Sequence, residues 1–199
     1  MPRPVHNPPR PRAAGCLRII SAVRGWCCGL LFLGLLALPA QAQVSKEYQL
    51  KAAFLYNFAK FVEWPAARFE SPAAPLVIGV FGKSPFGEEL QNIVRNRKIN
   101  GRDIVIKQVE TVTEARGAHL LFFSAAEDAR TRTILGELQG AGVLTVGETE
   151  QFSQLGGMIH FLLEGDKVRF DINMDSTGQT GLKISAQLQK LAKTVRRKK

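Results

Sequence analysis

Three short apolar runs constrain the fold of this 199-residue chain more than any other feature. They cover residues 76–81 (LVIGVF), 119–123 (HLLFF) and 143–146 (VLTV). Apolar runs of this length, without an alternating polar face, are typical of strands buried on both faces of a parallel sheet. Residues 104–109 alternate more clearly and predict a further strand.

Helical patterns lie between these runs, so the chain predicts strand–helix units. One helix is expected over residues 85–95 and another over residues 124–139. Ser124 and Glu127 form the S-x-x-E pattern of a capping box at the start of the second helix. Residues 96–101 are polar and predict a loop. Repeated strand–helix units predict a parallel sheet with right-handed crossovers.

The pattern changes towards the C-terminus. Residues 158–163 and 167–172 are two apolar segments joined by a short Gly/Asp connection, which predicts an antiparallel hairpin. A last helix is expected over residues 181–195. The predicted fold class is therefore α/β, a mixed sheet with parallel βαβ units and a C-terminal antiparallel hairpin, with helices on both faces.

An amphipathic helix is predicted before the first strand, over residues 45–64. Its apolar positions recur at helical spacing. They are Leu50, Phe54, Phe58 and Phe61. Pro65 is expected to stop this helix, because the residue before a proline is pushed out of the helical region.

The N-terminus has the pattern of a secretory leader. Arginines without any acidic residue precede an apolar run at 29–38, and Ala40-Gln41-Ala42 matches a signal-peptidase site. The run falls short of the roughly 20 apolar residues that span a bilayer. We therefore expect residues 1–42 to be a cleaved signal peptide, 43–195 a single domain outside the cytoplasm, and 196–199 a basic tail.

Removal of the leader changes the chemistry that the mature chain can carry. All three cysteines lie within residues 1–42, so disulfides, a thiolate nucleophile and cysteine metal sites are excluded. Of the 27 basic residues, 5 also leave, which leaves 22 against 17 acidic residues. This balance does not predict nucleic-acid binding. The basic tail is expected to be solvated, although contact with anionic lipid is an alternative.

No motif predicts catalysis, and we expect neither an enzyme nor a cofactor. Residues 79–84 (GVFGKS) lack the first glycine of a phosphate-binding loop. His119 and His160 each lie within an apolar strand, where a structural histidine is the better interpretation than a metal ligand. The aspartates near the hairpin lack the order of a calcium loop.

The stretch KAAFLYNFAKFVEWP at residues 51–65 is the longest and most specific of six that resemble one family, the YfiR family of periplasmic proteins. The others are residues 77–81, 101–102, 156–161, 168–173 and 181–185. Together they extend over nearly the whole of the predicted mature chain.

The resemblance implies a regulatory protein of cyclic di-GMP signalling and biofilm formation. YfiR-like proteins hold the periplasmic sensor domain of an inner-membrane diguanylate cyclase in its inactive state. An outer-membrane lipoprotein can capture the inhibitor, and the family forms homodimers. Family members also use disulfides, which the mature form of this chain cannot form because its cysteines lie in the leader.

Seven residues are candidates for partner binding. Those on the first helix and its end are Tyr56, Asn57, Lys60, Glu63 and Trp64. Trp64 is favoured because tryptophan is enriched among binding hot spots. Arg169 and Asn173 on the last strand complete the set, with a salt bridge and a strand-end turn as equally good interpretations.

The alternative function is binding of a small aromatic or nucleotide-like ligand. The aromatic first helix and the polar strand face around Arg169 could line a concave site for such a compound.

Overall fold

The computed structural model of this chain describes residues 39–178 and 180–197. The predicted leader lies outside the described residues except for its last four positions, and its cleavage stays a prediction. In the described part of the chain, no helix has both the length and the apolar character needed to cross a bilayer.

An eight-stranded mixed sheet forms the centre of the fold, in the order β10-β8-β7-β6-β5-β2-β4-β3. The strands are β2 (Leu76–Phe81), β3 (Lys98–Ile99), β4 (Arg102–Val109), β5 (Leu120–Phe123), β6 (Leu144–Gly147), β7 (Ile159–Glu164), β8 (Lys167–Asn173) and β10 (Thr194–Arg196). Strands β4, β2, β5, β6 and β7 run parallel to one another, and β8 returns antiparallel to β7. A separate two-stranded sheet pairs β1 (Val62–Glu63) with β9 (Lys183–Ile184).

Seven helices accompany these strands in the described residues. They are α2 (Pro39–Phe61), α3 (Glu89–Val94), α4 (Val112–Arg116), α5 (Asp128–Glu137), α6 (Glu150–Gln154), α7 (Met174–Gly178) and α8 (Ala186–Leu191). The predicted fold class is confirmed, including the parallel units, the antiparallel hairpin and helices on both faces.

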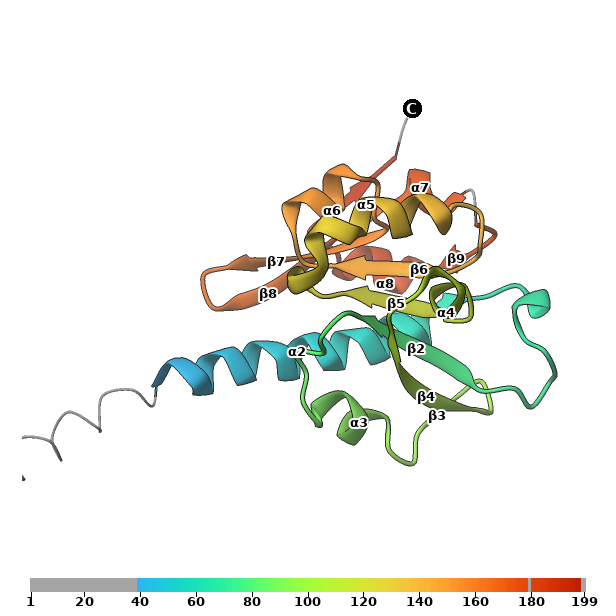
Figure 1. The fold of residues 1–199 in the computed structure, drawn as a ribbon, viewed down its shortest axis with the longest axis horizontal. Coiled ribbons are helices and arrows are strands. Elements are labelled where there is room, and N and C mark those ends of the chain that lie inside the picture. Colours follow the sequence, from blue (N-terminus) through green and yellow to red (C-terminus); the bar gives the residue numbers. More distant parts are fainter. Residues whose placement is uncertain (1–38, 179, 198–199) are drawn as a thin grey trace, which may run out of the picture. The chain divides into compact units, whose positions relative to one another are not determined.

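Side chains of β5 alternate between two cores, one on each face of the sheet. Leu120 and Phe122 pack in the core that contains α2, α3 and α8, whereas Leu121 and Phe123 pack in the core that contains α4, α5 and α6. Figure 1 shows α5 and α6 on one side of β5 and β6, and α2 on the other. Burial of both faces explains why this strand reads as a continuous apolar run.

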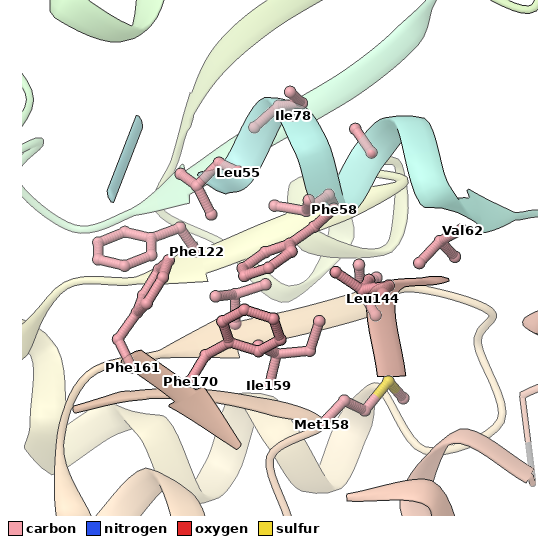
Figure 2. Close-up of a cluster of buried hydrophobic side chains, with 14 of the residues drawn as sticks. Leu55, Phe58, Val62, Ile78, Phe122, Leu144, Met158, Ile159, Phe161 and Phe170 are labelled. Atoms are coloured by element: carbon pink, nitrogen blue, oxygen red, sulfur yellow. The ribbon is translucent and has the colours of Figure 1, made fainter. Parts of the chain in front are cut away.

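Aromatic contacts fix α2 on the sheet. The ring of Phe58 lies 4.9 Å from that of Phe170 and 5.5 Å from that of Phe161, and Figure 2 shows these three side chains facing one another. Leu55 and Phe58 are fully buried, but Leu50 is 44% exposed. The buried stripe is therefore rotated from the predicted one, with Leu55 and Phe58 at its centre.

The first helix ends earlier than predicted. It stops at Phe61, and Val62 and Glu63 form β1 opposite Ile184 and Lys183. The backbone C=O of Phe61 accepts a hydrogen bond from the N–H of Ser185. Pairing with a segment about 120 residues away therefore ends the helix, rather than Pro65 alone.

The predicted capping box at Ser124 is wrong. Residues Ala125–Glu127 form a 3₁₀ turn, and α5 begins after Glu127 without a side-chain cap. A capping box does occur at α4, where Thr111 accepts from the Glu114 N–H and the Glu114 carboxylate accepts from the Thr111 N–H. The T-x-x-E pattern of residues 111–114 could have predicted this capping box from the sequence.

The predicted helix over residues 181–195 is also wrong. This segment forms β9, the short helix α8 and β10, with Ser185 capping α8. Strand β10 pairs with β8, and the Lys193 N–H donates to the Phe170 C=O. Arg196, assigned to the basic tail, lies in β10. The last two lysines of that tail lie outside the described residues.

The predicted loop at residues 96–101 contains a small hairpin. Strand β3 pairs antiparallel with the start of β4 through Asn100 and Gly101, whose φ angles are 51° and 79°. Asn-Gly is the dipeptide that best tolerates two positive φ angles in a two-residue hairpin turn. This turn places Asn100 and Arg102 beside the first residue of β2, which becomes important for the site.

Phe152 on α6 packs directly against two glycines. A Cβ atom would lie 2.4 Å from the Phe152 ring at Gly147 and 2.0 Å from it at Gly157. Phe152 is 1% exposed. Only glycine at these two positions lets α6 pack this closely on β6 and on the chain before β7.

We predict that Gly157→Ala lowers the free energy of unfolding by about 1–3 kcal/mol, because the new methyl group overlaps the Phe152 ring. Urea denaturation of residues 43–199 measures the change. Gly136→Ala is the matched control, because a Cβ at Gly136 within α5 has no neighbour within 4 Å. The control is expected to be neutral or slightly stabilising. Equal effects of the two substitutions would contradict the packing argument.

Candidate functional site

The chain leaves α2 through β1 and places Trp64 at the amino end of the parallel strands. The Trp64 indole N–H donates to the backbone C=O of His119, at 3.0 Å. Its ring also meets the His119 ring edge-on, with centroids 6.1 Å apart. His119 immediately precedes β5, so these contacts tie the end of α2 to the start of a central strand.

Phe69 and Arg102 form the next layer beside Trp64. The Phe69 ring stacks on His119 at 4.3 Å between centroids, and the Arg102 guanidinium lies 3.7 Å from the Phe69 centroid. Arg102 Nη1 donates to the carbonyls of Ser71 and Ala74, at 2.9 and 2.7 Å. The aromatic ring is thus held between a histidine and an anchored arginine.

These groups surround a hollow of about 240 Å³. Its lining residues are Glu63, Trp64, Phe69, Leu76, Ile99, Asn100 and Arg102. Leu76 begins β2 and Arg102 begins β4, so the hollow lies at the amino ends of the strands. Glu63 is exposed, whereas Leu76 and Ile99 are buried. The bottom of the hollow is therefore apolar, and its rim carries one acidic and one basic side chain.

His119 lies beneath this layer, and its Nε2 is buried without a hydrogen-bond partner. It is 5% exposed, and its Nδ1 accepts a hydrogen bond from the Val77 N–H at 3.1 Å. Burial, and then the nearby positive charge of Arg68, lower the pKa of His119 to about 4. The imidazole is therefore neutral at pH 7.

The structure brings only Glu63 and Trp64 of the seven predicted contact residues into this hollow. Tyr56 is half-buried, with the Arg97 guanidinium 5.0 Å from its ring centroid. Asn57 is half-buried and Lys60 is exposed, both on α2. These three residues lie on the helix that leads to the hollow, but they do not line it.

Arg169 and Asn173 lie on the other face of the sheet from α2. In β8, Val168, Phe170 and Ile172 pack in the core with α2, so the alternating residues Arg169 and Asn173 face the opposite way. The predicted concave site between the aromatic helix and Arg169 is therefore wrong. A strand has a side-chain period of two, which places neighbours on opposite faces.

Both residues also have the local partners that the alternative interpretation predicted. Arg169 Nε lies 3.8 Å from the Glu164 carboxylate, as an exposed ion pair. Asn173 Oδ1 accepts hydrogen bonds from the backbone N–H groups of Asp175 and Ser176, at 3.2 and 3.4 Å. Asn173 thus organises the start of α7 at the end of β8.

Sequence analysis missed a buried ion pair at the opposite, carboxyl end of the strands. Lys51 on α2 is 4% exposed, and its Nζ lies 2.5 Å from the carboxylate of Glu148, which follows β6. Lys51 also pairs with Glu47. The sequence could have predicted the burial of Lys51, because Lys51 falls one helical turn before Leu55 on the buried stripe.

Glu148 has two further hydrogen-bond donors. The Tyr48 hydroxyl donates to it at 3.3 Å, and the backbone N–H of Ala125, after β5, donates at 3.2 Å. Burial and the charge of Glu148 raise the pKa of Tyr48, so this phenol stays protonated. Ligands of open α/β sheets usually bind at the carboxyl ends of the strands. Here α2 and this ion pair occupy that position at β5 and β6.

The two ends of the sheet thus differ in what they offer. The described residues contain no group of three or more His, Cys, Asp or Glu side chains placed to hold a metal ion. The hollow beside Trp64 combines fixed aromatic walls with exposed polar groups, which are features of a binding site. Fold and site together define a mixed-sheet α/β domain with a hollow at its amino edge.

Comparison with known proteins identifies the family. The YfiR/HmsC-like family model matches residues 48–193, which includes most of α2, the hollow and the C-terminal hairpin. The chain belongs to the YfiR/HmsC-like family.

Two solved structures are similar at low sequence identity. A conserved domain protein from Vibrio cholerae O1 biovar El Tor strain N16961 has a TM-score of 0.52 and 9% identity, over 75% of this chain and 60% of that one. The ABC domain from Streptococcus pneumonia in complex with L-Trp has a TM-score of 0.43 and 11% identity, over 61% of this chain and 55% of that one. The matched parts thus span little more than half of each of those chains.

We predict that Lys51→Met lowers the free energy of unfolding by about 3–5 kcal/mol, because it leaves the buried Glu148 carboxylate without its cation. Lys60→Met is the control, since Lys60 is exposed on the same helix. Its effect is expected to stay within about 0.5 kcal/mol. Chemical denaturation compares the two variants, and similar values for both would show that the ion pair does not stabilise the fold.

The lowered pKa of His119 predicts a loss of stability in acid. Its folded-state pKa of about 4 lies below its ordinary value of 6.5, so the unfolded chain binds the proton first. The stabilisation is complete above pH 6.5 and is lost as the pH falls towards 4. The full difference corresponds to about 3 kcal/mol.

His119→Gln keeps an acceptor for the Val77 N–H but cannot titrate. Urea unfolding of both proteins between pH 7 and pH 4 should therefore show that the free energy of unfolding falls more steeply for the wild type. Other acidic groups titrate equally in both proteins, so the difference between the curves isolates His119. Parallel curves would contradict the assignment.

Proposed function

We propose that this protein is a periplasmic regulator that represses a membrane-bound diguanylate cyclase by binding its sensor domain. The observation that carries the proposal is the YfiR/HmsC-like family match over residues 48–193, which includes the whole of the site. A repressor of this kind is not an enzyme. It needs a surface that binds the inactive sensor more tightly than the active one.

The mechanism we propose is a shift of the sensor's conformational equilibrium. A binder shifts such an equilibrium only by its difference in affinity for the two states. A change from 1:99 to 99:1 requires a preference of about 5.5 kcal/mol. Capture of the regulator by an outer-membrane lipoprotein would reverse repression by mass action, because it lowers the concentration available to the cyclase. Redox control is not part of this proposal, since residues 43–199 contain no cysteine.

We place the partner surface at the end of α2. Tyr56, Asn57 and Lys60 lead along the helix to Glu63 and Trp64 at the hollow. Arg169 and Asn173 remain candidates for contact with a different partner or with a second copy in a homodimer, because they lie on the opposite face. A single flat partner surface does not include all seven residues.

Binding of a small aromatic compound is the second candidate function. The hollow of about 240 Å³ beside Trp64 and Phe69 favours it over the site first expected near Arg169. Drug-sized ligand sites measure about 300–1,000 Å³. The hollow therefore favours a compound with a single ring system over a nucleotide-like ligand.

We predict that deletion of the gene raises cyclic di-GMP in the native host, because the cyclase loses its repressor. Wild-type protein and an Arg132→Ala variant should restore the low level, whereas Trp64→Ala should not. The measurement is cyclic di-GMP in cell extracts, with the three proteins present at equal periplasmic levels by immunoblot.

Arg132→Ala is the matched control because Arg132 is an exposed residue of α5, which packs on the face of the sheet opposite α2. An unchanged cyclic di-GMP level on deletion, under conditions where the gene is expressed, would refute repression. Restoration of the low cyclic di-GMP level by Trp64→Ala would instead show that the partner does not contact the end of α2.

A further inference from the structure

We propose that the hollow beside Trp64 receives one large apolar side chain of the partner protein, with the adjoining peptide groups bound at its rim by Glu63 and Arg102. This inference rests on the proposed function and names the kind of contact through which it acts. Three properties of the hollow carry it: its size, the rigidity of its walls and the balance of charge at its rim.

The size of the hollow matches a single side chain. An engineered apolar cavity of about 150 Å³ binds benzene, and sites for drug-sized ligands begin at about 300 Å³. The hollow, at about 240 Å³, lies between these values. It therefore has room for a phenylalanine, tryptophan or leucine side chain. Interface hot spots are commonly residues of this size in desolvated pockets.

The walls of the hollow are ordered before anything binds. Trp64 is held by its hydrogen bond to the His119 C=O, and Phe69 is stacked on its two faces by His119 and Arg102. Arg102 is itself held by the carbonyls of Ser71 and Ala74. Binding to such a site loses little side-chain entropy, which improves affinity for an anchor that contributes only one residue.

The charges at the rim favour a peptide over a free ion. Glu63 contributes a carboxylate and Arg102 a guanidinium, so an isolated anion would meet Glu63 and an isolated cation would meet Arg102. A peptide segment carries one N–H donor and one C=O acceptor per residue. The Glu63 carboxylate can accept from the donor, and the Arg102 guanidinium can donate to the acceptor.

The test uses the fluorescence of Trp64 in a protein of residues 43–199, because Trp64 is the only tryptophan in that range of the sequence. N-acetyl-phenylalaninamide is the probe for a peptide-borne anchor, and N-acetyl-alaninamide is its control without the ring. Phenylacetate is the probe for a free small acid. We expect a saturable change in Trp64 emission with N-acetyl-phenylalaninamide, and at least tenfold weaker binding of the other two compounds.

Glu63→Ala tests the rim without altering the walls, because Glu63 is exposed. This substitution is expected to weaken the binding of N-acetyl-phenylalaninamide about three- to tenfold. It should strengthen the binding of phenylacetate, because the phenylacetate carboxylate no longer meets a like charge. Glu88→Ala is the matched control, an exposed acid at the start of α3 outside the hollow, and should leave both affinities unchanged. Circular dichroism of each variant verifies that it is folded.

Tighter binding of phenylacetate than of the blocked amide would overturn the inference and assign the hollow to a small acid. No saturable binding of N-acetyl-phenylalaninamide would also overturn it. Cyclic di-GMP in the deletion strain separates this failure from that of the proposed function. A rise on deletion without probe binding refutes only the hollow as the anchor site, whereas probe binding without a rise refutes the cyclase as the partner.

Discussion

The packing of α2 against the sheet is the interaction on which the rest of the structure depends. Leu55 and Phe58 are fully buried there, and full burial of a side chain of this size stabilises a fold by about 1.5–3 kcal/mol. The same contact sets the direction in which the chain leaves the helix. Val62 then pairs with Ile184, and Trp64 reaches the start of β5.

Two polar contacts connect the first helix and the segment after it to opposite ends of the parallel strands. Lys51 and Glu148 close the carboxyl ends of β5 and β6, the usual ligand position in open α/β sheets. The Trp64 indole instead binds backbone at the amino edge and leaves a hollow beside it. At this amino edge, where we propose that a partner binds, rigid aromatic walls meet an exposed acid and an anchored arginine.

Prediction from the sequence succeeded where the signal was local. The limits of β2 and the β7–β8 hairpin follow from apolar runs and a short Gly/Asp turn, which act within a few residues. It failed for residues 181–195, where Leu182, Ile184 and Leu188 have an apolar spacing that also suits a helix. These three are buried, but Leu191 on the same helical stripe is 57% exposed, and pairing of β9 with β1 and of β10 with β8 is non-local.

The sequence by itself determined the α/β class and the buried first helix, and it predicted Glu63 and Trp64, which both line the hollow. Apolar periodicity and residue type are sufficient for these, because each depends on neighbours in the chain. Only the tertiary structure decided that Phe69 and Arg102 join Trp64, and that Arg169 lies on the other face. Those outcomes depend on strand order and register, which arise from burial of side chains distant in sequence.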